Sequence, residues 1–133
     1  MNARRRIKLL NDLSSLISLE DFIFGCTFLS ENEMNRAKIL ATEFFDNIVM
    51  HSVQGFCGKV IVRVLKAESL ITIRLNYWTT NFGKMLNALD TTKPHYDGES
   101  LRYRGLGLRM CKNLASDIQY KKGLFKSSII IIL

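Results

Sequence analysis

Apolar and polar positions alternate with a helical period between Ser30 and Ser52, which predicts a long amphipathic helix. Ser30 precedes Glu33 by three residues, a capping box that satisfies free amide donors at a helix start. Glu43 and Asn47 are four residues apart, so they stack on one side of the helix at the edge of its apolar stripe. A solvated polar flank is the alternative interpretation of this pair. The apolar stripe consists of Met34, Ala37, Ala41, Phe44, Phe45 and Ile48.

Two further helices are predicted on either side of this one. The first covers about residues 12–26 and is capped by Asn11 or Asp12. The second covers residues 106–116. We expect the inward side chains of these two helices to be Leu13, Leu16, Ile17, Phe22, Phe24, Leu108, Cys111, Leu114 and Ala115.

Short runs rich in Val and Ile predict the strands. Residues 5–10 form an edge strand, 59–65 and 70–75 an antiparallel hairpin, and 118–120 and 124–133 a second hairpin. The apolar run 129–133 is expected inside the sheet. The pattern is lost from 76 to 104, a length typical of a functional lid. We therefore expect a single domain of residues 1–133, an α+β two-layer sandwich with helices on one face of a mostly antiparallel sheet.

Composition and charge narrow the classes of function. Of 133 residues, 47% are hydrophobic and 23% charged, as in ordinary folded domains. The net charge of +7 favours phosphate-bearing or acidic partners. The basic residues lie in three separate clusters without a nucleic-acid-binding motif, so we expect no direct nucleic-acid contact. A nucleic-acid binder is the third hypothesis, and it rests on charge alone. Three cysteines without a CxxC pair indicate a reduced, cytoplasmic protein, and no apolar run is long enough for a membrane.

A glycine-rich turn is expected to open the last helix. It reads Arg104-Gly105-Leu106-Gly107-Leu108. Two glycines let the backbone approach a ligand, and helix amides together with an arginine attract phosphate. A tight turn without a ligand is the alternative, because a Gly-x-Gly motif alone has little specificity.

The motifs in this order resemble the GHKL (Bergerat-fold) ATPase superfamily, and within it the bacterial anti-sigma-factor serine kinases. The resemblance rests on Glu43-x-x-x-Asn47 with His51 on one helix, then a hairpin, a long lid and the turn from Arg104 to Leu108. It covers nearly the whole chain. The resemblance implies a histidine kinase-like ATPase domain of Bergerat type that binds ATP and Mg²⁺.

Individual roles follow from the resemblance. Glu43 corresponds to the base that activates the attacking hydroxyl, and Asn47 corresponds to the magnesium ligand. Gly105, Leu106, Gly107 and Leu108 correspond to the phosphate cradle, with Arg104 beside them. The implied partner is a sigma factor or an anti-sigma antagonist, and a homodimer is left open.

The chain departs from the family after the first hairpin. Asn76 stands where the family has the Asp that binds the adenine amino group, and Trp78 stands where it has a glycine. The Asn76 carbonyl still accepts a hydrogen bond. Trp78 either stacks on the base or fills the adenine pocket. Two functions therefore remain: an ATP-binding regulator with serine/threonine kinase activity, or a non-catalytic binding module of the same fold that has lost ATP.

Overall fold

The computed structural model describes residues 2–51, 58–78, 95–97, 102–104, 111–123 and 126–133. Residues 111–114 form a further helical turn. The elements in chain order are β1 (Asn2–Leu10), a 3-10 turn (Leu13–Ser15), α1 (Leu16–Phe24), α2 (Glu31–His51), β2 (Lys59–Ala67), β3 (Leu70–Trp78), β4 (His95–Asp97), β5 (Arg102–Arg104), β6 (Asp117–Lys122) and β7 (Lys126–Ile132).

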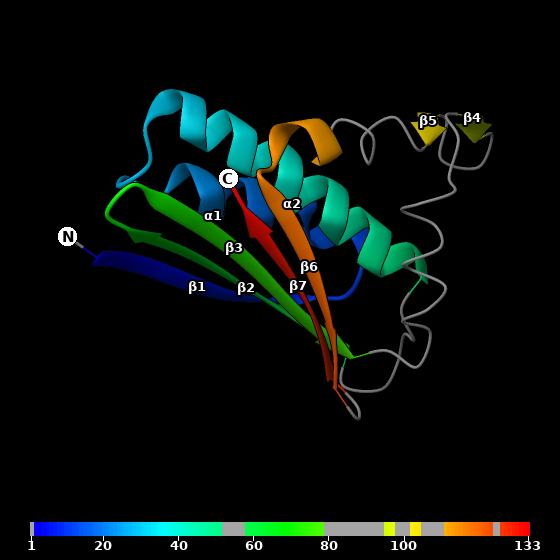
Figure 1. Ribbon diagram of the computed structural model, residues 1–133. Helices are drawn as coiled ribbons and strands as arrows, with labels where there is room; N and C mark the ends of the chain where they lie inside the picture. The colour runs from blue at the N-terminus through cyan, green and yellow to red at the C-terminus, as the bar shows by residue number, and fades with distance from the viewer. Residues whose placement is uncertain (1, 52–57, 79–94, 98–101, 105–110, 124–125) are drawn as a thin grey trace.

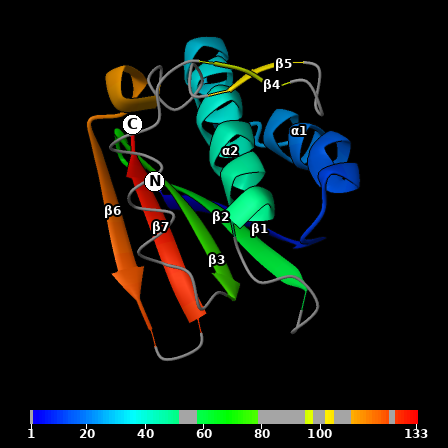
Figure 2. The ribbon, with the colours of Figure 1, turned by 90° about the vertical axis from the view of Figure 1, so that its right-hand side faces the viewer.

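The main sheet has five strands in the order β1-β2-β3-β7-β6, and every neighbouring pair is antiparallel. Strands β4 and β5 form a separate two-stranded sheet. Helices α1 and α2 lie on the same face of the main sheet (Figures 1 and 2), and no described helix covers the other face. An α+β fold with helices over a mostly antiparallel sheet is thereby confirmed, as are the two predicted hairpins.

The hydrophobic core lies between α2 and the three central strands. Alternate residues of these strands point toward the helices, as the two-residue period of a strand requires. Each fully buried aliphatic side chain contributes about 1.5–3 kcal/mol relative to an exposed one. The buried strand residues are Val60, Val62, Val64, Ile71, Ile73, Leu75, Tyr77, Ile129 and Ile131.

The terminal isoleucines lie inside the sheet, as expected. Strand β7 is flanked by β3 on one side and β6 on the other. Ile129 and Ile131 are both 0% exposed, while Ile130 and Ile132 on the other face are half-buried.

Helix α1 differs from its prediction in both length and orientation. It begins at Leu16, after the 3-10 turn in which the Asp12 side chain accepts a hydrogen bond from the Ser14 amide at 2.9 Å. Ile17 is 73% exposed, and Leu13 and Phe24 are also exposed, so the inward placement of these three was wrong. Phe22 is buried and Leu16 packs against the core, as predicted, and Leu19, Ile23 and Cys26 complete the buried stripe.

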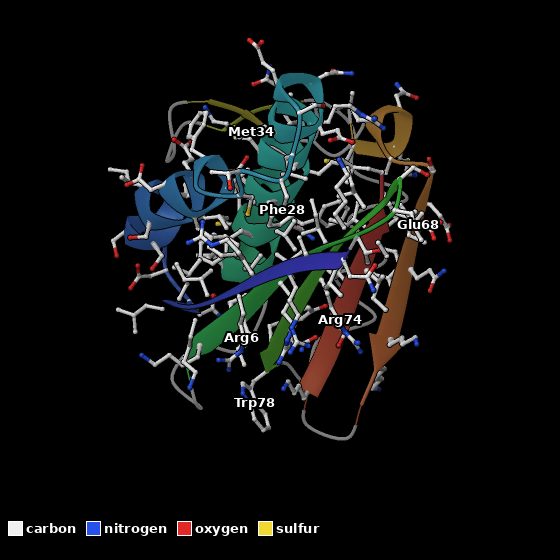
Figure 3. All side chains as sticks on the ribbon, turned by 90° about the vertical axis from the view of Figure 1, so that its left-hand side faces the viewer. Arg6, Phe28, Met34, Glu68, Arg74 and Trp78 are labelled. Carbon is white, nitrogen blue, oxygen red and sulfur yellow. The ribbon has the colours of Figure 1, made fainter. Side chains whose placement is uncertain are left out.

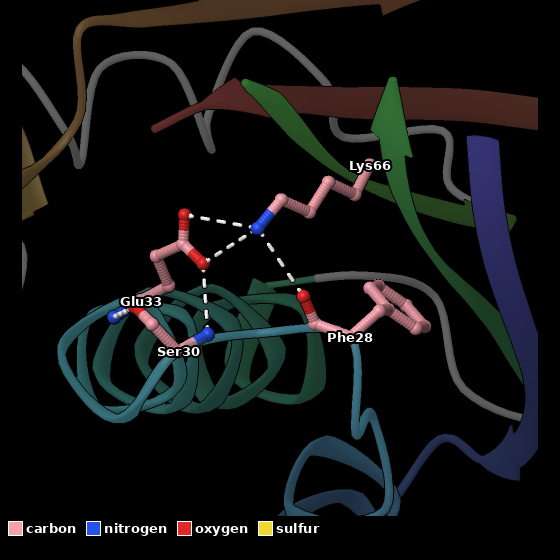
Figure 4. Close-up of polar contacts among 4 residues, drawn as sticks. All are labelled: Phe28, Ser30, Glu33 and Lys66. Atoms are coloured by element: carbon pink, nitrogen blue, oxygen red, sulfur yellow. Dashed lines mark hydrogen bonds and ion pairs between the residues drawn. The ribbon is translucent and has the colours of Figure 1, made fainter. Parts of the chain in front are cut away.

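A polar cluster joins the start of α2 to the end of β2 (Figure 4). The predicted capping box is present: the Ser30 amide donates to Glu33 Oε1 at 2.8 Å, and the Glu33 amide donates to Ser30 Oγ at 3.2 Å. Lys66 Nζ lies 3.0 Å from Glu33 Oε1 and donates to the Phe28 carbonyl at 3.2 Å. Glu33 therefore anchors α2 to the sheet as well as capping the helix.

Strand β3 extends to Trp78. The irregular segment predicted to begin at Asn76 therefore does not begin there, and that boundary was wrong. The remainder of the predicted lid is described only at β4 and β5. The glycine turn 105–108 and the start of the predicted helix 106–116 lie outside the described residues.

Candidate functional site

The side of α2 that carries Glu43 and Asn47 faces the interior of the domain. Helix α2 packs against β3, and Figure 2 shows its second half above that strand. Asn47 is only 6% exposed and Glu43 is half-buried, so the pair does not form a solvated flank. The buried Nδ2 of Asn47 has no hydrogen-bond partner among the described residues. A buried amide that makes no hydrogen bond costs stability, so the unbonded nitrogen within the described part of the chain marks this position for closer attention.

Glu43 lies close to Cys111, in the helical turn that follows the glycine motif in the sequence. Burial raises the pKa of the Cys111 thiol to about 12, and the negative charge of Glu43 adds to the increase. A second contact holds the same two elements together, since Arg36 Nη2 donates to the Leu114 carbonyl at 2.6 Å. Arg36 and Glu43 are seven residues apart, so both contacts come from one side of α2.

Two hydroxyl groups extend this polar region across the sheet. Tyr77 and Ser127 are cross-strand partners on the face that carries the helices, and their exposed fractions are 0% and 1%. Neither hydroxyl has a hydrogen-bond partner among the described residues. Burial raises the pKa of the Tyr77 phenol, so this hydroxyl stays protonated at neutral pH and is available as a donor. The sequence analysis missed both residues.

Asn76 does not share this region. Ile71, Ile73, Leu75 and Tyr77 point toward the helices, so Asn76 points to the opposite face. There its Oδ1 accepts a hydrogen bond from Ser128 Oγ at 2.7 Å. The oxygen expected to bind adenine is therefore engaged within the sheet, on the other side from Glu43 and Asn47.

Trp78 also lies on the face away from the helices (Figure 3), opposite Lys126 in the sheet register. Whether Trp78 stacks on adenine or fills its pocket stays a prediction. The sequence indicates which face of β3 Trp78 occupies, because the alternate aliphatic residues Ile71, Ile73 and Leu75 mark the buried face and position 78 is out of phase with them. Tyr77, the preceding residue of β3, is the nearest one that faces the helices.

The backbone of Arg104 ends β5, and Gly105, Leu106, Gly107 and Leu108 lie outside the described residues. The structure thus brings Glu43 and Asn47 to one place and puts Asn76 and Trp78 on the opposite face. Within the described residues, no group of three or more His, Cys, Asp or Glu side chains could hold a metal ion.

Two comparisons with known proteins find no match. No protein-family model matches the chain, and a search of curated proteins finds no relative. Among the helices that the structure describes, none is both long and apolar enough to span a lipid bilayer.

Proposed function

We propose that the chain is an anti-sigma-factor-like regulatory protein of Bergerat type, acting in the cytoplasm. In this proposal it binds ATP mainly through the phosphates and Mg²⁺ and phosphorylates a serine or threonine of its partner. One observation carries the proposal: Glu43 of α2 lies near Cys111, which follows Gly107 by only four residues in the sequence. The two motifs on which the resemblance depends are therefore expected to meet.

The residues of α2 fit the proposed roles. Mg²⁺ prefers hard oxygen ligands and retains several waters, so one protein carboxamide together with phosphate oxygens is sufficient. Asn47 supplies such a carboxamide through its Oδ1, and its side chain is buried on the same side of α2 as Glu43. A bound magnesium ion would neutralise charge on the phosphates. Glu43, four residues earlier, accepts the proton of the attacking hydroxyl.

Recognition of the base is expected to be weak. On β3 the residues that face α2 near the end of the strand are Leu75 and Tyr77, and neither is an acid. Titration calorimetry with MgATP, MgGTP and magnesium tripolyphosphate tests the proposal. We expect ATP and GTP to bind with affinities within about tenfold, a difference of about 1.4 kcal/mol. No heat with any of the three would contradict nucleotide binding.

Two substitutions separate the roles on α2. Asn47→Ala should weaken nucleotide binding about tenfold in Mg²⁺ and little in EDTA, because it removes a metal ligand. The exposed Asn35 of the same helix provides the matched control, Asn35→Ala. Glu43→Ala should abolish phosphotransfer and largely preserve affinity, since a base acts in the transition state. An unchanged phosphorylation rate would remove Glu43 from the mechanism.

The second candidate is a non-catalytic regulator of the same fold that binds its protein partner without ATP. The position of Asn76 favours it, because the expected adenine acceptor lies on the wrong face and is bonded to Ser128. Partner binding that is unaffected by Asn47→Ala, in a protein that gives no heat with nucleotides, would select this candidate over the first.

A further inference from the structure

Three arginines form a row from the edge strand β1 to the central strand β3, on the sheet face that no described helix covers. Arg6 of β1 is directly opposite Arg63 of β2, and Arg63 is directly opposite Arg74 of β3. Cross-strand partners point to the same face, and Figure 3 shows Arg6 and Arg74 on the side away from the helices. Neighbouring strands are about 4.8 Å apart, so the row spans about 10 Å.

The row is not neutralised within the described residues. None of them forms an ion pair with Arg6, Arg63 or Arg74, and the buried Nε of Arg74 has no hydrogen-bond partner. By the register, the acidic residue on this face is Asp117, at the far edge, where it accepts a hydrogen bond from Gln119. Further basic residues on the same face are Arg4, Lys8, Lys59, Lys121 and Lys126.

Such an arrangement destabilises the isolated protein. Like charges directly opposite each other in a sheet are unfavourable, and Arg63 has an arginine on both sides. An anion that bridges neighbouring guanidinium groups would remove this repulsion, and the planar fork of arginine matches phosphate oxygens bidentately. The charge pattern therefore points to a ligand with several phosphates.

We propose that this face, defined by Arg6, Arg63, Arg74 and Trp78, binds single-stranded nucleic acid. The arginine row contacts the phosphates. Trp78, four residues beyond Arg74 on β3 and about 13 Å along the strand, stacks on a base. Phosphate contacts from arginines combined with an aromatic ring on a sheet surface are the chemistry by which exposed sheets hold single strands.

A narrow chain fits this face better than the other polyanions. Arg63 and Arg74 are half-buried among their neighbours, so a flat bilayer would meet the outermost side chains first. An acidic peptide usually binds sheets by adding a strand at an edge, which would leave Arg63 and Arg74 uncovered. The inference is independent of nucleotide binding at Glu43 and Asn47, which are on the other side of the sheet.

The test measures binding of a short fluorescein-labelled oligouridylate to the full chain by fluorescence anisotropy. The double variant Arg63→Gln/Arg74→Gln removes two charges from the row. We expect it to lose at least about tenfold in affinity and to reduce the slope of log K against log salt by about 1.4, as two lost phosphate contacts require. The oligouridylate should also quench Trp78, the single tryptophan of the chain.

A matched control removes two charges elsewhere. Lys38 is on α2, and Lys122 is on the helix side of β6, opposite Ser127. The variant Lys38→Gln/Lys122→Gln has the same net charge as Arg63→Gln/Arg74→Gln. It should bind the oligouridylate with the affinity of the parent protein. Equal losses in both double variants would overturn the proposal by showing a general charge effect. Binding only to phosphatidylserine-containing vesicles, or to neither probe, would overturn it as well.

Discussion

At the scale of single residues, Glu33 makes two separate contributions to the fold. It completes the capping box with Ser30 and pairs with Lys66 at 3.0 Å. The hydrogen bond from the Ser30 amide and the contact with Lys66 hold the pKa of Glu33 below its usual value. A carboxylate with a lowered pKa stabilises the folded state above its ordinary pKa, and this contribution is lost as the pH falls through the folded-state value.

Glu33→Ala should therefore lower the free energy of unfolding at neutral pH by about 1 kcal/mol, mainly through the lost cap. Urea denaturation at a series of pH values measures this. The difference between parent and variant should shrink as the pH falls below 4.5, the ordinary pKa of the group. Glu31→Ala, in the same helical turn but without these contacts, is the control. A pH-independent difference would contradict the electrostatic part of the explanation.

Arg63 stands between two other arginines, so replacing it should stabilise the protein in the absence of a ligand. Arg63→Gln is expected to gain about 0.2–1 kcal/mol, the range measured for cross-strand pairs. The gain should be larger at low ionic strength, because salt screens the repulsion. Chemical denaturation at two salt concentrations measures the free energy of unfolding, with Lys38→Gln as the control. A loss of stability of Arg63→Gln at low salt would contradict this prediction.

At the scale of elements, α1 and the 3-10 turn before it carry two apolar stripes with helical spacing. Leu13, Ile17 and Phe24 form one, and the buried stripe built on Leu19 and Ile23 forms the other. Periodicity alone does not distinguish them. Helix α1 packs against α2 and β1, and these contacts turn the side with Leu19 and Ile23 toward the core.

A pair of isoleucines tests this orientation. Ile23→Ala should cost about 2–5 kcal/mol because it leaves a cavity in the core. Ile17→Ala, at a side chain that is 73% exposed, should stay within about 0.5 kcal/mol of the parent. Thermal denaturation of the two variants compares them directly, and similar losses would indicate that the helix is rotated.

The contact between α2 and the turn 111–114 has a chemical signature. Because the pKa of Cys111 is raised to about 12 by burial and by Glu43, its thiol should resist iodoacetamide at pH 8 in the folded protein. Glu43→Gln should increase the alkylation rate at higher pH, since one cause of the increase is removed. Peptide mass spectrometry follows Cys111 separately from the other cysteines. Rapid alkylation of Cys111 in the folded parent would place it away from the core.

At the scale of the whole molecule, the sheet separates two regions of different chemistry. The helix side holds Glu43, Asn47 and the buried hydroxyls of Tyr77 and Ser127. The other side holds the arginine row and Trp78 (Figure 3). Ligands on opposite faces of a sheet do not compete for the same atoms.

Both proposed ligands should therefore bind together. Saturating MgATP should leave the affinity for oligouridylate unchanged, and Trp78 fluorescence should respond to the oligouridylate and not to MgATP. Fluorescence titrations in each order measure this. Displacement of one ligand by the other would mean that they share a site.

The local features of the chain were accessible from the sequence. The capping box, the stripe of α2 and the two hairpins depend on residues within a few positions of one another, and each is present. The placement of Glu43 and Asn47 on one side of α2 follows from the same local geometry. The α+β class then follows, because an amphipathic helix buries its apolar stripe by packing on a face of the sheet that the hairpins form.

Relations between distant segments required the tertiary structure. The sequence by itself determined which elements form, through periodicity, caps and turns. Only the fold decided that α1 buries Leu19 instead of Ile17, and that Asn76 pairs with Ser128 away from α2. Arg6, Arg63 and Arg74 are separated along the chain by 57 and 11 positions, yet strand register makes them direct neighbours. Register depends on burying one face of every strand at once, and no single segment contains that information.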